Sequence, residues 1–160
     1  MSDPSRPNPM RPIMGWREWI SLPHLGVEQI KAKIDTGARS SALHAFEIEA
    51  FEQQGQTLLR FKIHPEQKND AFVIEAEAEL LDRREIRNSG GKAELRFVIQ
   101  TEVTLNHQTW PIELTLTNRD NMGFRMLLGR EAVRGRFLVD PGQSFLQSAA
   151  LHSTLEQQRT

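Results

Sequence analysis

Apolar and polar residues alternate in short runs along most of the chain. Ile30, Ala32 and Ile34, for example, alternate with glutamine and lysine residues. An alternation with a period of two is typical of β-strands that bury one face. The pattern predicts strands over residues 16–22, 28–34, 42–50, 57–63, 71–81, 93–105, 109–117 and 136–139.

Turn residues separate these runs, among them Pro23, Gly55 and the run Asn88-Ser89-Gly90-Gly91. Many short strands divided by regular turn signals predict an all-β fold. Residues 130–134 are the one stretch with a clear helical character, and it is short. Residues 146–158 fit a C-terminal helix or a loose segment equally well, and the pattern does not decide between the two.

The length of 160 residues suits one compact domain with a core of its own. Residues 1–14 carry four prolines among polar side chains, which predicts a flexible N-terminal arm. We therefore expect a folded domain over residues 15–146 and a C-terminal tail over residues 147–160.

Composition narrows the class of protein. The formal net charge is -1, which argues against nucleic acid or an anionic membrane as the main partner. The chain has no cysteine, so it has neither disulfides nor cysteine-ligated metal. No apolar run has the length of a signal sequence or of a membrane helix. We expect a cytoplasmic protein.

The segment Ile34-Asp35-Thr36-Gly37-Ala38 carries the candidate chemistry. An apolar strand that runs into Asp-Thr-Gly presents a carboxylate at its end, as in an aspartic peptidase. Hydrolysis by this route needs two carboxylates that share one proton, one to activate water and one to polarise the scissile carbonyl. The chain has only one Asp-Thr-Gly, so the sequence predicts a site shared by the two copies of a homodimer.

Each residue of this segment has an expected role. Asp35 is the catalytic carboxylate, and the Thr36 hydroxyl can lock the loop to its symmetry mate. Gly37 allows two backbones to approach closely. Ala38 keeps the floor of the cleft low. The later run Met126-Leu127-Leu128-Gly129-Arg130 is expected to support the site from behind, with Leu128, Gly129 and Arg130 as structural residues.

Simpler interpretations stand beside these. Asp-Thr-Gly is also a common turn tripeptide, because Asp and Gly both favour turns. A non-catalytic module that binds a peptide along the same groove is the alternative function. Arg130 is expected to form a structural ion pair, with Asp120 and Asp140 as candidate partners.

The chain carries the Asp-Thr-Gly and Leu-Leu-Gly-Arg segments together with Gly15-Trp16-Arg17-Glu18-Trp19 and Trp110-Pro111-Ile112-Glu113-Leu114. In these segments it resembles a bacterial family of retropepsin-like aspartic peptidases. Its members are often labelled ATP-dependent zinc proteases. The resemblance implies a closed, retropepsin-like acid-protease β-barrel with one short helix after Leu-Leu-Gly-Arg. It also implies a homodimer that hydrolyses peptide bonds and takes no cofactor.

The sequence has no recognised motif for binding the zinc or the ATP that this label names. Zinc peptidases of the common type carry His-Glu-x-x-His on a helix, and this chain has none. Its five histidines are widely spread, and no phosphate-binding Gly-x-x-x-x-Gly-Lys-Ser/Thr loop is present. We therefore expect neither a metal nor a nucleotide in the site.

Two features bear on the substrate. The glycine turn at Ser89, Gly90 and Gly91 predicts a hairpin that is either a flap over the substrate or an ordinary surface hairpin. Arg39 follows the motif and either attracts acidic substrates at the cleft edge or is solvated or paired structurally. Members of the family are often found beside glutamate ligases, which implies glutamate-rich tails as substrates. We therefore list Ala38, Arg39, Ser89, Gly90 and Gly91 as expected substrate-binding residues.

Overall fold

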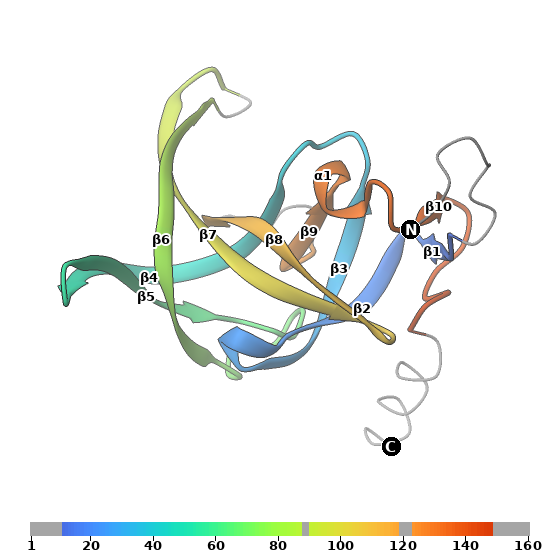
Figure 1. Ribbon diagram of the computed structural model, residues 1–160, viewed down its shortest axis with the longest axis horizontal. Helices are drawn as coiled ribbons and strands as arrows, with labels where there is room; N and C mark the ends of the chain where they lie inside the picture. The colour runs from blue at the N-terminus through green and yellow to red at the C-terminus, as the bar shows by residue number, and fades with distance from the viewer. Residues whose placement is uncertain (1–10, 88–89, 119–122, 149–160) are drawn as a thin grey trace.

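The computed structural model describes residues 11–87, 90–118 and 123–148 (Figure 1). Strands account for most of this part of the chain. The elements are β1 (Ile13–Gly15), β2 (Arg17–Leu22), the 3-10 helix η1 (Pro23–Leu25), β3 (Val27–Asp35), β4 (Ser41–Gln53), β5 (Gln56–Ile63), β6 (Ile74–Arg87), β7 (Ala93–Leu105), β8 (Gln108–Thr117), β9 (Met126–Gly129), α1 (Arg130–Val133) and β10 (Leu138–Asp140). The prediction of an all-β fold with one short helix is confirmed.

The sheet closes on itself. Within the described residues, eight strands pair in the order β2-β3-β9-β4-β5-β6-β7-β8. Two further pairings, β4 with β8 and β2 with β7, complete a ring through β2, β3, β9, β4, β8 and β7. The β2–β7 contact is a single residue pair, Ser21 with Thr104. The predicted retropepsin-like barrel is therefore present, with this narrow seam as its closing point.

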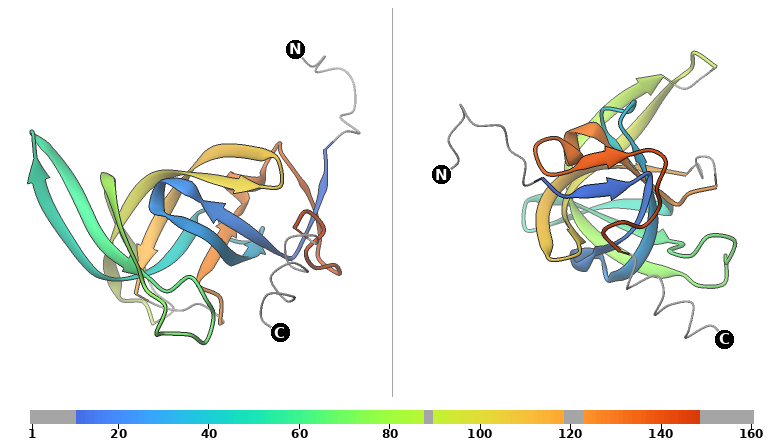
Figure 2. Two further views of the ribbon diagram at one scale, coloured as in Figure 1. Left: turned by 90° about the horizontal axis from the view of Figure 1, so that it is seen from below. Right: turned by 90° about the vertical axis from the view of Figure 1, so that its right-hand side faces the viewer.

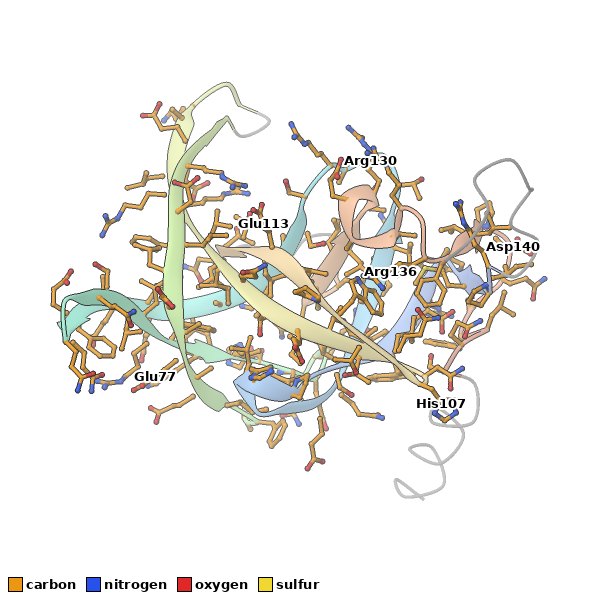
Figure 3. The ribbon with its side chains drawn as sticks, viewed as in Figure 1. Glu77, His107, Glu113, Arg130, Arg136 and Asp140 are labelled. Atoms are coloured by element: carbon orange, nitrogen blue, oxygen red, sulfur yellow. The ribbon has the colours of Figure 1, made fainter. Side chains whose placement is uncertain are left out.

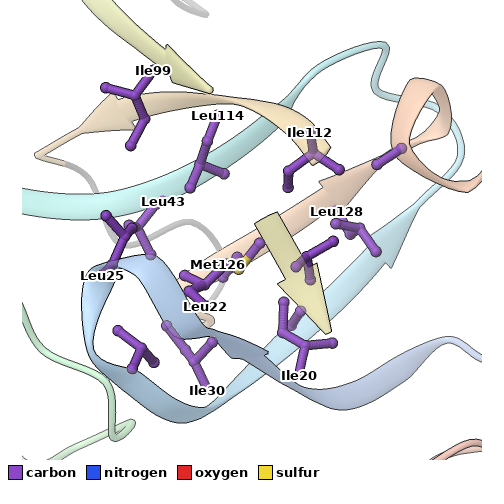
Figure 4. Packing of buried hydrophobic residues seen from close by; sticks show 14 of the residues in the cluster. Ile20, Leu22, Leu25, Ile30, Leu43, Ile99, Ile112, Leu114, Met126 and Leu128 are labelled. Carbon is purple, nitrogen blue, oxygen red and sulfur yellow. The ribbon is translucent and has the colours of Figure 1, made fainter. Parts of the chain in front are cut away.

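The core explains the strand pattern. In β3 the residues Ile30, Ala32 and Ile34 are buried, as the alternation predicts. In β9 every residue is buried, because the strand lies between β3 and β4 with side chains covered on both faces. A strand of this kind has a continuous apolar run and no alternation. Leu43 and Leu128 pack here among aliphatic side chains from the surrounding strands (Figure 4).

Two long hairpins extend away from the barrel. β4 and β5 form one hairpin, and β6 and β7 form the other, which rises on the same side of the molecule as α1 and the loop between β3 and β4 (Figure 1). β6 begins at Ile74, three residues after the predicted start, because residues 71–73 are exposed and lie in a turn and coil.

The two ends of the described chain lie side by side. β1 pairs in parallel with β10 in a separate two-stranded sheet (Figure 2). Ile13 and Met14 belong to this sheet, and Met14 is fully buried, so folded structure begins inside the range expected to be an arm. Ser148 is buried as well, two residues beyond the expected end of the domain. The question of a helix over residues 146–158 falls mostly outside the described residues.

Candidate active site

Asp35 is the last residue of β3, and its carboxylate is partly exposed. The Gly37 amide donates a hydrogen bond to Asp35 Oδ1 at 3.0 Å. The Ala38 amide donates to the Asp35 backbone oxygen at 3.2 Å. These two bonds turn the chain sharply after the strand and hold the carboxylate at the start of a tight loop, the Asp35 loop. Among the described residues, no donor forms a hydrogen bond with its second oxygen.

β9 supports this loop from behind. Asp35 and Gly129 are register partners in the parallel pairing of β3 with β9. A Cβ atom on Gly129 would lie 2.6 Å from the Ser40 carbonyl oxygen and 2.9 Å from the Arg39 oxygen. The loop passes so close to the strand that only glycine fits there.

Ser41 ties the same two segments together. Its hydroxyl is buried and accepts a hydrogen bond from the Gly129 amide at 3.0 Å. Ser41 was not among the site residues expected from the sequence. The signal was present, since a small hydroxyl residue follows the Asp-Thr-Gly turn, but the partner lies 88 residues away in the chain.

The helix α1 holds the far side of the loop. The Arg130 amide donates to the Ala38 oxygen at 2.8 Å, and the Glu131 amide donates to the Arg39 oxygen at 3.2 Å. The Arg130 guanidinium reaches back to the Gly37 oxygen at 3.4 Å. Arg130 therefore contacts the Asp35 loop through both its backbone and its side chain.

The predicted partner of Arg130 is wrong where it can be checked. Asp140 lies apart from Arg130 (Figure 3), and its carboxylate accepts a hydrogen bond from the Gly142 amide. Asp120, the other candidate, lies outside the described residues. Among the carboxylates that the structure describes, none forms an ion pair with Arg130. Its charge interacts with a backbone carbonyl, because α1 directs the side chain over the loop.

A pocket of about 680 Å³ lies beside the loop. The loop, the β6 arm of the second hairpin, β8 and α1 all contribute to its wall. Its charged lining residues are Arg39, Arg84, Glu85, Glu113 and Glu131. Arg39 is exposed and forms no ion pair with a described carboxylate, so it is a solvated arginine at the rim of this pocket.

Arg84 links the hairpin to the body of the barrel across this pocket. It donates to Asp82 Oδ2 at 2.8 Å and to Glu113 Oε2 at 3.1 Å (Glu113 is labelled in Figure 3). The bond from Arg84, followed by one from the Arg83 amide, lowers the pKa of Asp82. The bonds to Asp82 and Glu113 raise the pKa of Arg84. Arg84 and Glu113 lie 29 residues apart in the chain, so no local sequence pattern predicts this link.

The predicted glycine hairpin is present. β6 and β7 stay paired out to Arg87 and Ala93, and Gly90 and Gly91 are exposed at the turn. Ser89 lies outside the described residues. Thr36 and Gly37 are exposed on the surface of the Asp35 loop. Contacts of any of these residues with a substrate or a second subunit stay predictions.

A family model described as "RimB-like: Retropepsin-like aspartic endopeptidase RimB" matches residues 13–150. The chain belongs to this family. The match covers the Asp35 loop, the hairpin, β9 and α1 in one span. The RimB-like assignment thus agrees with the geometry, in which one strand-end aspartate is held against a Leu-Gly-Arg segment.

Curated relatives carry a different name. A "Probable alpha-L-glutamate ligase" of Shewanella pealeana is 47% identical over 133 residues, and one of Parasynechococcus marenigrum is 51% identical over 129 residues. These matches take in 83% and 81% of this chain but only 29% and 28% of the relatives. The chain thus spans less than a third of the length of the curated relatives it matches.

A solved structure shares the fold. The crystal structure of a Legionella pneumophila protein of unknown function aligns with a TM-score of 0.72 and 29% identity. The alignment covers 85% of this chain and 98% of that protein. The two proteins therefore share this fold over most of their lengths.

Two features of the described part of the chain bear on metal binding and membrane insertion. No group of three or more histidine, aspartate or glutamate side chains is placed there to hold a metal ion. His44 and His64 do come together, with ring centroids 5.9 Å apart, in a stack that includes Phe46. No helix within the same residues is long and apolar enough to cross a membrane.

Proposed function

We propose that this RimB-like protein is an aspartic peptidase whose site forms when two subunits bring their Asp35 carboxylates together. One observation carries the proposal: Asp35 ends β3 in a loop that β9 and α1 hold by backbone hydrogen bonds, with one carboxylate oxygen left available. Such rigid support on both sides is what a pair of carboxylates needs to keep a fixed separation.

The chemistry follows from the two carboxylates. Two such groups at close range cannot both ionise easily, so they share a proton. The ionised carboxylate accepts a proton from a water molecule, and the oxygen of that water attacks the peptide carbonyl carbon. The protonated carboxyl donates to the carbonyl oxygen. Cleavage then releases an amine and a carboxylic acid.

A second copy of the chain supplies what one copy lacks. Each subunit contributes one Asp-Thr-Gly, so a two-fold axis next to the Asp35 loop gives the required pair. The exposed Thr36 hydroxyl is then in position to bond to the partner's loop. The β6–β7 hairpins of the two subunits cover the cleft from the same side and exclude water once substrate is bound.

Acidic, glutamate-rich peptides are the substrate class we propose. Arg39 is solvated at the rim of the pocket beside the loop and is available to an incoming carboxylate. The relatives that contain a matching segment are named as probable glutamate ligases, and a glutamate ligase and a peptidase in one chain would both handle glutamate chains. Cleavage of glutamate-rich tails would account both for the solvated Arg39 and for a matching segment within proteins named as glutamate ligases.

A cleavage assay tests the proposed activity. Wild type, Asp35→Asn and a control, Asp140→Asn, are incubated with a mixed peptide library that includes oligoglutamate, between about pH 4 and 7. We expect cleavage by wild type and the control and a loss of about 100-fold or more in Asp35→Asn. Equal cleavage by all three would contradict the proposal, and no cleavage by any would favour the peptide-binding module.

A further inference from the structure

The segment Gly15-Trp16-Arg17-Glu18-Trp19 has no part in the proposed chemistry, yet it makes many polar contacts to a distant part of the chain. Its partner is the stretch of residues 143–148, which we call the C-terminal strap. The strap lies along β2 and the residues just before it. We call residues 15–19 together with the strap the cradle. β2 already pairs with β3 in the barrel, so the barrel does not need the strap to hold β2 in place.

Glu18 is the centre of the cradle. Its side chain is fully buried, and no described cation forms an ion pair with it. Instead Oε2 accepts from the amides of Gly15 at 2.6 Å and Leu146 at 2.9 Å. Oε1 accepts from the Gln147 amide at 3.1 Å and from the Ser148 amide and hydroxyl at 3.0 and 2.7 Å. Each of these groups donates a hydrogen bond to Glu18, and a carboxylate, which only accepts, can satisfy all of them.

The strap is shaped to surround this charge. Phe145 has a φ of 57°, a left-handed conformation that is uncommon for an aromatic residue. The turn there directs the successive amides of residues 146, 147 and 148 toward one point. Successive amides in such a turn form a concave anion site. In this protein Glu18 is the anion, and backbone strain at Phe145 persists because the carboxylate holds the turn.

The rest of the segment fixes the register of the strap. A Cβ atom on Gly15 would lie 2.5 Å from the Gln143 oxygen, so the strap approaches the backbone directly. The Trp16 amide donates to that oxygen at 2.8 Å. The Arg17 guanidinium lies between the rings of Trp16 and Phe145, at 4.7 and 4.9 Å from their centroids. These contacts leave the strap one position along β2.

The cradle also reaches the catalytic loop. The Trp16 oxygen accepts a hydrogen bond from the Ile34 amide at 2.7 Å, one residue before Asp35. Arg17 pairs with Lys33 in the next register position. The amide of Trp16 therefore bonds to the strap, and its carbonyl oxygen bonds to the end of β3. A shift of the strap moves the residue that anchors Asp35.

On this geometry we infer that Glu18 is a positioning residue for Asp35, acting through the C-terminal strap and the Trp16–Ile34 hydrogen bond. The inference rests on the proposed aspartic peptidase activity for its functional consequence. Glu18 does not touch substrate. It fixes the position of the Asp35 carboxylate relative to the cleft floor. In a two-subunit site an error in this position occurs twice, because each aspartate depends on the Glu18 of its own subunit.

The test uses the full-length chain with Glu18→Gln, which keeps the shape of the side chain but turns an amide NH₂ toward hydrogen-bond donors. Backbone amide hydrogen exchange is measured over residues 143–148 and 33–38. The inference predicts faster exchange in both segments. It also predicts a kcat about tenfold lower or more with KM changed by less than about twofold, since misplacement of a reacting group affects the chemical step.

Two further variants make the result specific. Leu59→Ala removes a buried side chain of β5, a strand that pairs with β4 and β6, and it should leave exchange at residues 33–38 and kcat of the folded protein near wild type. Ser148→Ala removes only the hydroxyl that donates to Glu18 and accepts from the Trp19 amide. It should produce a smaller change in the same direction, and it replaces Glu18→Gln if that variant does not fold.

Unchanged exchange over residues 33–38 in a variant whose strap exchanges faster would overturn the inference, because the strap would then move without moving the loop. Equal effects of Leu59→Ala would also overturn it. These readouts need no activity. A wild type that cleaves nothing would refute the proposed function alone, while the exchange data would still decide the coupling.

Discussion

A Cβ atom on Gly129 would lie 2.6 Å from both the carbonyl carbon and the oxygen of Ser40. This closeness keeps the Asp35 loop against β9. We predict that Gly129→Ala lowers the free energy of unfolding by about 1–3 kcal/mol, because backbone atoms must move to make room. Urea denaturation measures the change. Gly142→Ala is the matched control, since its Cβ would have an ordinary contact at 3.5 Å; equal losses in the two variants would refute the steric account.

Ser41 satisfies the buried amide of Gly129. Replacing it with alanine leaves that amide without an acceptor, and we expect a loss of about 1–3 kcal/mol in unfolding free energy. Ser40→Ala is the control, because Ser40 is exposed and one position away. The denaturation midpoints of the two variants should differ clearly. If Ser41→Ala matches wild type, the hydrogen bond is not needed to hold the loop.

The pKa of Asp82 is held below its ordinary value of 3.8 mainly by the Arg84 guanidinium and then by the Arg83 amide. We predict that Arg84→Gln raises this pKa toward 3.8, as read from the Asp82 carboxyl carbon in an NMR titration. Arg83→Gln is the control, because its amide stays in place.

The direction of the pH effect on stability follows from this lowered pKa. A carboxyl with a lowered folded-state pKa stabilises the fold above the unfolded-state value, and that stabilisation is lost as pH falls through the folded-state value. The stability difference between wild type and Arg84→Gln should therefore shrink below about pH 3.8. A difference that stays constant down to pH 2 would show that Asp82 is not involved.

Arg39 provides the test of substrate class. We predict that Arg39→Glu lowers kcat/KM for oligoglutamate on the order of tenfold at low salt, because it replaces an attraction with a repulsion. The effect on a neutral peptide should be small, and added salt should reduce the difference. Arg60→Glu, on β5, controls for net charge. An equal loss on neutral and acidic peptides would argue against a role in selecting acidic substrates.

The sequence was sufficient for features that depend on neighbouring residues. The strand before Asp35, the turn after it and the buried run of β9 are all encoded locally. β1 and β10 were missed or misplaced because strands of three residues carry too short a pattern. The Gly129–Ser41 and Arg84–Glu113 bonds join residues far apart in the chain, so no local pattern reports them.

Glu18 shows the limit most clearly. A glutamate in a strand is normally read as facing solvent, yet this one is fully buried. The reason is the strap, which covers that face of β2 from more than a hundred residues away. Burial of a polar residue depends on what packs over it, and alternation describes only the strand itself.

The central claim is that two Asp35 carboxylates from two subunits make one site. The most direct measurement mixes wild type with a ninefold excess of Asp35→Asn, allows the subunits to exchange, and follows peptide cleavage per wild-type subunit. Random pairing leaves about a tenth of the wild-type subunits with an intact partner, so the account predicts a fall of about tenfold. Cleavage per wild-type subunit that stays unchanged at every ratio, with exchange confirmed, would contradict the account.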